Sequence, residues 1–373
     1  MKKEASSLYY ITFQDFPAHT ANSQQTISTC KYFVRNSYRV HLFFPLRSKN
    51  SSDNFDKISN YYEIKNCKFD VTGIEFSFKF ENKKVFKKFN FVIKHILWSY
   101  KCVEKVTKNF DVPSHYMTRS EWVFFFLSRK NLKVVYECHQ LTKLRKLVIQ
   151  KSLNSDNSKI IFLNNNLLSD MNFKTYNQDK VLLQNNGYDE DYFYSNDKKK
   201  GKKVIFAGNL YRFGKLRNLD FIIMAFQEKA LKDYELCIVG GSNLESEKLK
   251  NKYNMFKNVS FLNNQSKNNL GSILSNSDIG LLLNDDNKHS MFYSDPLKFY
   301  EYLASGLNVV APDFSSHRAI DKYNNVYFYL NNDLKSFISA VNSAFDNPFD
   351  NQDLNKLPTV DMRVKNIIKF INS

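Results

Sequence analysis

The amino-acid sequence predicts an α/β protein made of two doubly wound domains. Short segments rich in β-branched and aromatic residues alternate along the chain with longer segments of helical periodicity. The alternation is interrupted once, by the lysine-rich segment 194–203, and then begins again. Strands that alternate with helices form a parallel sheet with helices on both faces, so each half of the 373 residues predicts one such sheet.

The first half of the chain contains six segments with the composition of strands. They are 8–13, 39–45, 114–119, 133–138, 159–164 and 180–185. Helices are expected between them, at about 22–36, 83–110 and 121–130. We therefore place an N-terminal domain at residues 1–197.

The second half repeats this pattern. Strands are expected at 204–209, 234–241, 259–264, 278–284, 308–311 and 326–330, with helices near 217–231, 267–276 and 297–305. We place a C-terminal domain at residues 198–373. Its last segment, about 359–373, is an amphipathic helix that can pack on either domain, including back on the N-terminal one.

The composition describes a folded protein with anionic neighbours. The net charge of +17 suits anionic lipid, nucleic acid or phosphorylated small molecules. No run of about 18 uncharged apolar residues predicts a membrane span, and the charged N-terminus does not resemble a secretory signal. The five cysteines form no C-x-x-C pair, so we expect a cytoplasmic protein without a zinc site or disulfide framework.

The segment SDPLKFYEYLASGLNVVAPD predicts a short helix, a glycine stop and a buried strand. Pro296 suits the first helical position, and Ser294 or Asp295 can cap the helix. The helix is apolar around most of its surface, except for a polar stripe that holds Lys298 and Glu301. The stripe predicts a helix that lines a cleft. The alternative is an ordinary ion pair at a solvent-exposed edge.

Basic residues are expected beside this helix. Ligands of doubly wound domains bind at the carboxyl ends of the strands. The loop after the first strand of the second half carries Arg212, Lys215 and Arg217, which would gather near Lys298 and the positive helix N-terminus. Glu301, one turn further on, suits a bidentate acceptor for sugar hydroxyls. The combination predicts a site for a nucleotide with phosphates and a ribose.

Several segments in this order resemble those of glycosyltransferase family 4, which has the GT-B fold. They are VLLQNNGYDEDYF, VIFAGNLYRFGKLRNLDFIIMAF, CIVGG, FLNNQSKNNLGSILSNSDIGLLL and DPLKFYEYLASGLNVVAPD. The resemblance covers nearly the whole chain and is strongest from Val181 to Asp313. It implies two Rossmann-like domains that face each other across a cleft, with the acceptor on the N-terminal side and the nucleotide sugar on the C-terminal side.

The resemblance also implies roles for residues of the second half. Arg217 falls on the basic position that holds the donor diphosphate, with Lys215 and Arg212 as alternatives, and Lys298 would face the same diphosphate. The second glutamate of the family pattern falls on Glu301, which would hold the ribose. The first glutamate of the family pattern falls on Tyr293, so this glutamate is absent from the chain. The other donor-binding candidates are Gly208, Asn209, Ser294, Asp295 and Leu297.

The N-terminal half resembles the family less specifically. The segment FPAHTANSQQ lies where many members have a glycine-rich loop, and Asn22 and Ser23 are the candidates to replace it. Arg119 and Glu137 lie at two strand ends that resemble the family's acceptor side. His139 would point at the donor sugar, and the alternative is a polar loop histidine.

The resemblance implies a retaining hexosyltransferase that needs neither metal nor cofactor, with His139, Arg217 and Lys298 as its catalytic residues. The acceptor would be a glycan or a lipid-linked sugar in surface-polysaccharide synthesis. The basic, aromatic segment 83–110 would attach the protein to the inner face of the plasma membrane, and no nucleic acid is expected. The alternatives are a sugar-nucleotide epimerase on the same fold, and a non-enzymatic basic protein that binds membrane or nucleic acid.

Overall fold

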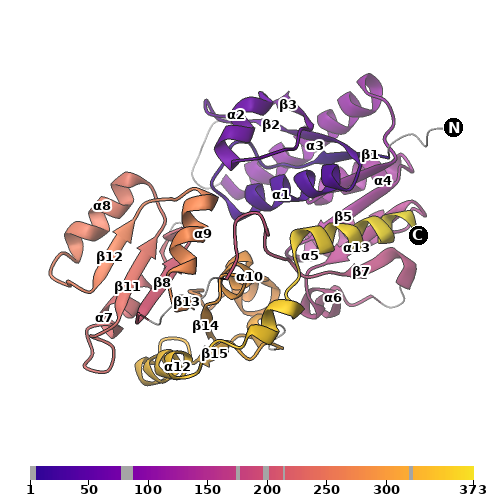
Figure 1. The fold of residues 1–373 in the computed structure, drawn as a ribbon. Coiled ribbons are helices and arrows are strands. Elements are labelled where there is room, and N and C mark those ends of the chain that lie inside the picture. Colours follow the sequence, from indigo (N-terminus) through magenta and orange to yellow (C-terminus); the bar gives the residue numbers. More distant parts are fainter. Residues whose placement is uncertain (1–5, 77–86, 174–176, 196–200, 213–214, 319–321) are drawn as a thin grey trace. The chain divides into compact units, whose positions relative to one another are not determined.

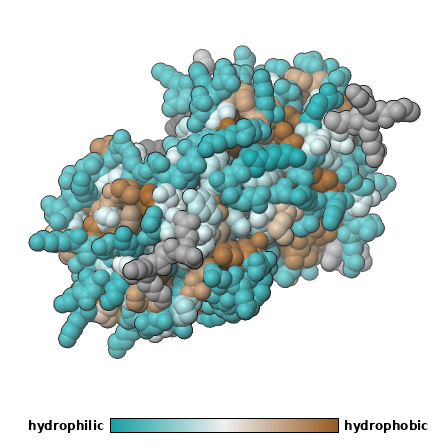
Figure 2. All heavy atoms as spheres, in the orientation of Figure 1, coloured by the Kyte–Doolittle hydropathy of each residue, from teal (hydrophilic) through white to brown (hydrophobic). Residues whose placement is uncertain are grey.

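The computed structural model describes residues 6–76, 87–173, 177–195, 201–212, 215–318 and 322–373 (Figure 1). The chain divides into two compact units. Unit 1 comprises Met1–Gln184 together with Asp361–Ser373, and unit 2 comprises Asn185–Val360. In the described part of the chain, no helix has both the length and the apolar character that crossing a bilayer requires. Most of the face seen in Figure 2 is hydrophilic, in agreement with the 24% of charged residues.

Unit 1 is built on a seven-stranded parallel sheet with the order β3-β2-β1-β4-β5-β6-β7. The strands are β1 (Ser7–Ile11), β2 (Arg39–Leu46), β3 (Asp70–Glu75), β4 (His115–Thr118), β5 (Val134–Cys138), β6 (Ser158–Phe162) and β7 (Val181–Leu183). The helices are α1 (Ala21–Arg35), α2 (Phe55–Tyr62), α3 (Lys87–Asn109), α4 (Glu121–Arg129), α5 (Lys143–Ser152), α6 (Asn165–Met171) and α13 (Val360–Asn372). The strand order reverses between β1 and β4, and such a switch point opens a crevice at the carboxyl ends of the strands.

Unit 2 is built on a six-stranded parallel sheet with the order β12-β11-β8-β13-β14-β15. The strands are β8 (Lys203–Ala207), β11 (Glu235–Val239), β12 (Val259–Leu262), β13 (Ile279–Leu281), β14 (Asn308–Pro312) and β15 (Val326–Tyr329). A small hairpin joins β9 (Tyr211–Arg212) to β10 (Lys215–Leu216). The helices are α7 (Leu219–Ala225), α8 (Asn243–Lys252), α9 (Lys267–Ser275), α10 (Leu297–Ala304), α11 (Ser315–Arg318) and α12 (Leu334–Asp346). Here the switch point lies between β8 and β13.

The core of unit 2 lies on both faces of its sheet. Along β8, Val204 and Phe206 belong to one hydrophobic cluster, whereas Ile205 and Ala207 belong to another. Successive side chains of a strand point to opposite faces, so both faces of this strand are buried. This explains why β8 is a continuous apolar run rather than an alternating one.

The two units meet in the sequence at Gln184 and Asn185, earlier than the boundary expected after residue 197. The difference has a physical cause, because the segment that follows β7 is anchored in unit 2. Its backbone and side-chain amides at Asn186 donate to Asp295 at 2.6 Å each, and its Tyr192 and Phe193 are part of a unit 2 core cluster.

The C-terminal helix α13 packs on unit 1 (Figure 1). Asp361 accepts a hydrogen bond from Asn36 at 2.8 Å near the helix start, and the carbonyl of Ile371 lies 3.0 Å from His115 Nε2 near its end. Between these contacts, Arg363 forms a buried ion pair with a strand of the sheet, at Glu137.

Helix α3 is the described part of the predicted membrane segment 83–110, and residues 83–86 and the side chains of Lys87 and Lys88 lie outside the described residues. Phe89 and Phe91 are 63% and 54% exposed, and Tyr100 is also exposed. The sequence-based expectation is wrong for one of its aromatic residues. Trp98 is fully buried, because it faces the sheet and contacts Phe13 at a ring-centroid distance of 5.3 Å.

Candidate functional site

The N-terminus of α10 in unit 2 is left open by the side chains before it. The helix begins at Leu297 with Pro296 as its N-cap, and no side chain caps it. The expected capping by Ser294 or Asp295 is therefore wrong. Ser294 donates to the carbonyl of Ser290 at 2.9 Å, and Asp295 accepts from Tyr300 at 2.7 Å as well as from the segment after β7. Both are buried residues that fix the approach of the chain to the helix.

Lys298, in the first turn of α10, lies against the end of β8. A Cβ atom added to Gly208 would lie 2.7 Å from Lys298 Cε, so a side chain at Gly208 would displace the lysine. The same strand end is crowded on its other side, since a Cβ on Gly240 would lie 1.8 Å from the carbonyl oxygen of Gly208. Burial lowers the pKa of Lys298, Glu301 acts to raise it, and Arg217 lowers it further.

Glu301 and Lys298 do not form the ordinary ion pair that was the alternative explanation of the polar stripe. Within the described residues, neither side chain has a hydrogen-bond or ion-pair partner, although Glu301 is only 8% exposed. A buried charge without a partner is costly, so the arrangement favours a site that a ligand completes.

Arg217 belongs to the same group of residues. Its backbone N–H donates to Leu210 at 2.8 Å, its Nη1 donates to the carbonyl of Leu283, and its guanidinium lies 5.8 Å from the centre of the Phe206 ring. The structure thus brings together Arg217, Lys298, Glu301 and Gly208 at the carboxyl end of the unit 2 sheet.

The other candidates of unit 2 lie in the loop after β8, in the β9–β10 hairpin and before α10. Asn209 is exposed in the loop after β8. Arg212 and Lys215 are backbone partners in the β9–β10 hairpin, and their side chains lie outside the described residues. Tyr293, which replaces the first glutamate of the family pattern, is buried in the short helical segment His289–Tyr293.

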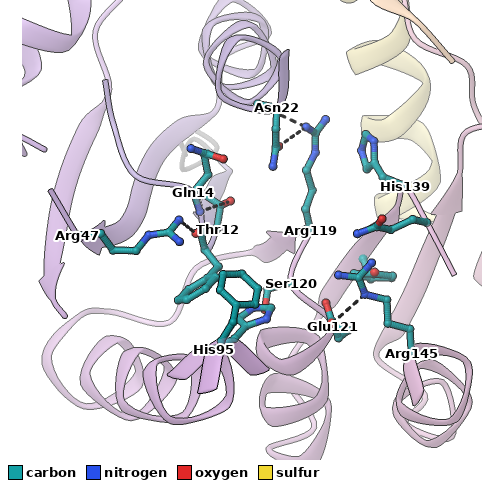
Figure 3. A pocket seen from close by; sticks show the side chains of 14 residues that line it. Thr12, Gln14, Asn22, Arg47, His95, Arg119, Ser120, Glu121, His139 and Arg145 are labelled. Atoms are coloured by element: carbon teal, nitrogen blue, oxygen red, sulfur yellow. Dashed lines mark hydrogen bonds and ion pairs between the residues drawn. The ribbon is translucent and has the colours of Figure 1, made fainter. Parts of the chain in front are cut away.

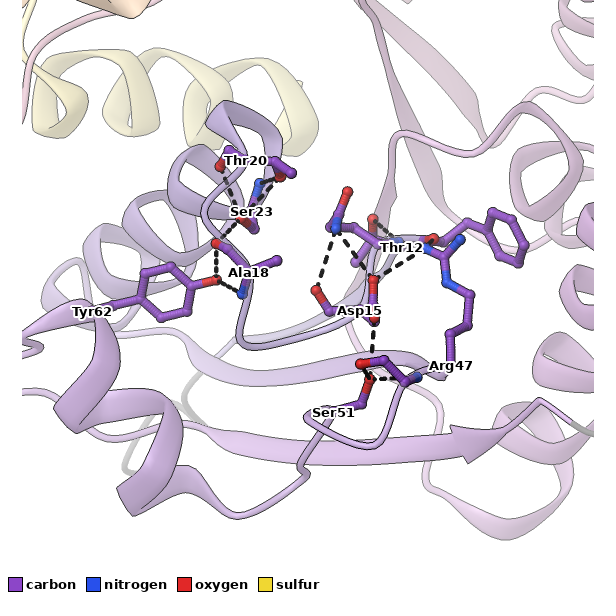
Figure 4. A network of polar contacts seen from close by, with 11 residues as sticks. Thr12, Asp15, Ala18, Thr20, Ser23, Arg47, Ser51 and Tyr62 are labelled. Atoms are coloured by element: carbon purple, nitrogen blue, oxygen red, sulfur yellow. Dashed lines mark hydrogen bonds and ion pairs between the residues drawn. The ribbon is translucent and has the colours of Figure 1, made fainter. Parts of the chain in front are cut away.

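In unit 1, the loop after β1 is held in place by side chains (Figure 4). The hydroxyl of Tyr62 donates to the carbonyl of Ala18 at 2.8 Å and accepts from its N–H at 2.8 Å. Ser51 donates to Asp15 at 3.1 Å. Ser23 is fully buried and donates to Ala18 at 2.5 Å, so its hydroxyl faces its own loop. This polar loop, which the hydrogen bonds hold in place, lies at the position where many members of glycosyltransferase family 4 have a glycine-rich loop.

Glu137 is the centre of a buried ionic cluster at the end of β5. Its Oε1 lies 2.6 Å from Arg119 and 2.5 Å from Nε2 of His139, and its Oε2 lies 2.7 Å from Arg363 on α13. Burial alone would raise the pKa of Glu137, but the charges of Arg119 and Arg363 lower it well below its ordinary value. Arg119 also donates to Asn22 at 2.6 Å. The predicted acceptor-side residues Asn22, Arg119 and Glu137 are thus connected to each other, and Ser23 is not.

His139 is neutral at pH 7, because burial and the charge of Arg119 lower its pKa to about 4. A neutral imidazole beside an ionised carboxylate carries its proton on the nitrogen that faces that carboxylate, which here is Nε2. Nδ1 of His139 is consequently a hydrogen-bond acceptor.

A pocket of about 250 Å³ opens at this end of the unit 1 sheet (Figure 3). Polar side chains make up most of its wall, together with Phe13, Phe91 and Tyr136. The polar lining residues are Thr12, Gln14, Asn22, Arg47, His95, Arg119, Ser120, Glu121, His139, Gln140 and Arg145.

Sequence analysis missed two arginines of this pocket and the arginine behind it. Arg47 follows β2 directly, so the rule that ligands bind at carboxyl strand ends could have identified it. Arg145 is in α5, a helix that was not predicted, and Arg363 reaches Glu137 from 226 residues away. Nothing local in the sequence indicates either of these two contacts.

The described residues contain no group of three or more His, Cys, Asp or Glu side chains arranged to hold a metal ion. Asp285 and Asp286, part of the NDDNKH segment, lie in the loop that follows β13.

Comparisons with known proteins agree with this architecture. Residues 201–347 match a family model described as Glycosyl transferases group 1. Among solved structures, sucrose-phosphate synthase from Thermosynechococcus elongatus is 14% identical, with 98% of this chain and 94% of that chain covered and a TM-score of 0.66. TarM is 11% identical, with 99% of each chain covered and a TM-score of 0.69. Alr3699/HepE from Anabaena, in complex with UDP and glucose, is 10% identical, with 98% and 97% covered and a TM-score of 0.59. A comparison with curated proteins gives no match. Together with the two parallel sheets, these neighbours confirm the predicted fold class.

Proposed function

We propose that this chain, which has the GT-B fold, is a glycosyltransferase that transfers a hexose from a nucleotide-diphosphate sugar to a glycan or lipid-linked acceptor. We further propose that the transfer retains the anomeric configuration, needs neither metal nor cofactor, and serves surface-polysaccharide synthesis in the cytoplasm. The observation that carries the proposal is Lys298, a partly buried ammonium group that has no carboxylate at ion-pair distance within the described residues and lies beside a helix N-terminus that no side chain caps.

The donor diphosphate would be held by charge. Arg217 and Lys298 supply two cations, and the amides of Leu297 and Lys298, which no side chain caps, supply the positive end of the α10 dipole. Glu301, one turn further along the helix, would accept hydrogen bonds from the ribose hydroxyls. Gly208 would leave room for the diphosphate, since any side chain there collides with Lys298. HepE from Anabaena was solved with UDP-glucose, which supports UDP as the first nucleotide to test.

In the proposed reaction, the bond from the anomeric carbon to the diphosphate oxygen breaks, and the acceptor oxygen bonds to the same face of that carbon. The acceptor proton passes to the departing diphosphate, so no protein nucleophile is required. Arg217 and Lys298 would stabilise the negative charge of the leaving group, which is electrostatic catalysis by preorganised groups. Nδ1 of His139 would accept a hydrogen bond from a hydroxyl of the transferred sugar rather than act as a base.

The first test is calorimetry of the full chain with UDP, GDP and ADP, each with and without EDTA. We expect one of them to bind, with an affinity that EDTA does not change. Transfer to an acceptor, followed by NMR of the anomeric proton, then tests retention. Release of a free epimer without any acceptor would instead favour the epimerase, and no binding of any nucleoside diphosphate would contradict the proposal.

We also propose that α3 attaches the protein to an anionic membrane. Its exposed Phe89 and Phe91 lie on the same helix as the exposed Lys101 and Lys105, and this combination suits an interfacial helix. Each lysine near the surface adds up to about 1 kcal/mol of attraction to anionic lipid.

Vesicle flotation tests this attachment. Binding should require anionic lipid, weaken as salt increases, and fall in the variants Lys101→Gln/Lys105→Gln and Phe89→Ser/Phe91→Ser. Equal binding to neutral and anionic vesicles, or none to either, would contradict the attachment and favour a water-soluble acceptor.

A further inference from the structure

The pocket of unit 1 has an excess of positive charge on its wall (Figure 3). Among the described residues, three guanidinium groups line it, those of Arg47, Arg119 and Arg145, and one carboxylate, that of Glu121. The two histidines of the wall do not change this balance in either direction near neutral pH, because burial lowers the pKa of each to about 4.

Two of the three arginines have a carboxylate within hydrogen-bond distance, although the Nε of Arg119, like that of Arg47, is buried without a partner. Arg119 is only 5% exposed and lies 2.6 Å from both Glu137 and Asn22. The Nε of Arg145 lies 2.9 Å from Glu121. Its terminal nitrogens donate to the side-chain oxygen of Gln140 when the amide group of Gln140 is turned so that its oxygen faces the arginine. Both guanidinium groups are therefore supported by a close carboxylate.

The positive charge of Arg47 is less well compensated by a nearby carboxylate. Its nearest carboxylate, Asp15, is 3.6 Å away, outside hydrogen-bond distance, and that carboxylate also accepts from Ser51 at 3.1 Å. Its Nη2 donates to the carbonyl of Phe13, whose ring centre lies 4.3 Å from the guanidinium, while its Nε is buried without a partner. Burial lowers the pKa of Arg47 by more than Asp15 raises it. The side chain is 24% exposed, so its charge remains accessible from the pocket.

We propose that this pocket recognises a phosphate group carried by the acceptor, and that Arg47 is its direct contact. The inference rests on the proposed function, because it names the chemistry of the acceptor that the transferase would use. A phosphate monoester carries about −1.5 to −2 charges at neutral pH and accepts hydrogen bonds from several directions. It therefore suits a wall with several guanidinium groups better than a neutral sugar does.

The rest of the wall suits the remainder of such an acceptor. Gln14, Gln140 and Asn22 offer amide groups for sugar hydroxyls, and Tyr136 offers an aromatic surface. The volume of about 250 Å³ lies just below the usual range for ligand pockets, about 300–1,000 Å³, so the pocket suits one phosphorylated sugar rather than a long glycan.

The test is calorimetry on the full chain saturated with UDP, which occupies the donor site and prevents a sugar phosphate from binding there. The probes are glucose 6-phosphate, glucose and glucuronate. We expect glucose 6-phosphate to bind at least about tenfold more tightly than glucose and glucuronate. Arg47→Gln should weaken the binding of glucose 6-phosphate about ten- to hundredfold, and Arg47→Lys should weaken this binding less. Arg39→Gln, at the exposed opposite end of β2, is the matched control and should leave it unchanged.

Two further arms identify the source of the phosphate. If glycerophosphoglycerol binds more tightly than glucose 6-phosphate, and Arg47→Gln abolishes this binding, the source is a lipid phosphodiester. If glucose 6-phosphate binds more tightly, the source is a free sugar phosphate. Equal affinity for glucose and glucose 6-phosphate, a preference for glucuronate, or equal phosphate binding by Arg47→Gln would overturn the inference. If UDP, GDP and ADP all fail to bind, the proposed function fails, and the same probes on the free chain still test the pocket.

Discussion

Replacing Lys298 with methionine separates a binding role from a structural one. Methionine keeps an unbranched stem that packs against Gly208 but removes the partly buried charge. In the ligand-free protein this charge has no carboxylate partner in the described residues, and burial lowers its pKa. Removing it should therefore leave the free energy of unfolding unchanged or increase it.

The same substitution should strongly weaken the binding of a nucleoside diphosphate. A hydrogen bond to a charged group contributes about 1.5–3 kcal/mol, and 1.4 kcal/mol corresponds to a factor of ten, so the dissociation constant should rise about ten- to 150-fold. Glu301→Gln should weaken the binding of a nucleoside diphosphate more than the binding of inorganic diphosphate, because the proposed partner of Glu301 is the ribose.

The assay is calorimetry with UDP and with inorganic diphosphate, combined with urea unfolding of the same samples. Lys248→Met, at an exposed position of α8, is the matched control and should change neither quantity. The reasoning is refuted if Lys298→Met binds UDP like the parent protein, or if it loses stability without a selective loss of diphosphate binding.

Three further predictions concern unit 1. His139→Ala should lower turnover at saturating donor while leaving UDP affinity unchanged, and a parallel loss of both in steady-state kinetics and calorimetry would contradict a role limited to the transferred sugar. Arg363→Gln should cost about 3 kcal/mol or more of stability in urea unfolding, because it leaves part of the buried charge of Glu137 unpaired; a change below 1 kcal/mol would show that Arg119 suffices. His95 should make the parent protein lose stability as the pH falls, since burial lowers its pKa from about 6.5 to about 4 and the unfolded chain then takes up a proton that the folded one does not. The expected contribution is about 2 kcal/mol between pH 7 and pH 5, and it should disappear in His95→Gln; an identical pH dependence in both proteins would exclude this assignment.

Local patterns were sufficient to predict most of the fold. The apolar runs of β8 and β14 identify strands buried on both faces, and these strands alternate with helices along both halves of the chain. The strand β3 was missed because it is an edge strand that contains Asp70 and Gly73, two residues that strands disfavour. Helices α2, α5 and α6 were missed because they are short, between seven and ten residues, and give few turns of periodicity.

The residues proposed for the donor side each lie at a feature that local patterns can locate. Lys298 and Glu301 share one stripe of one helix, and Arg217 follows a strand end, so periodicity and strand polarity locate them. The capping of α10 was predicted wrongly for a long-range reason. Asp295 accepts from Asn186, 109 residues away, and is therefore not available to the helix N-terminus.

By itself, the sequence determined most of the strands and helices, the sheet edges at which ligands are expected, and the polar stripe that interrupts an apolar helix. These properties depend on residues within a few turns of each other, and local periodicity records them. Only the tertiary structure decided which charges remain uncompensated. Lys298 and Glu301 stay unpaired although they are three residues apart, while Glu137 gains Arg363 from 226 residues away and Arg47 keeps only a distant carboxylate. Compensation depends on distances of a few ångströms between segments remote in the sequence, and folding alone sets those distances.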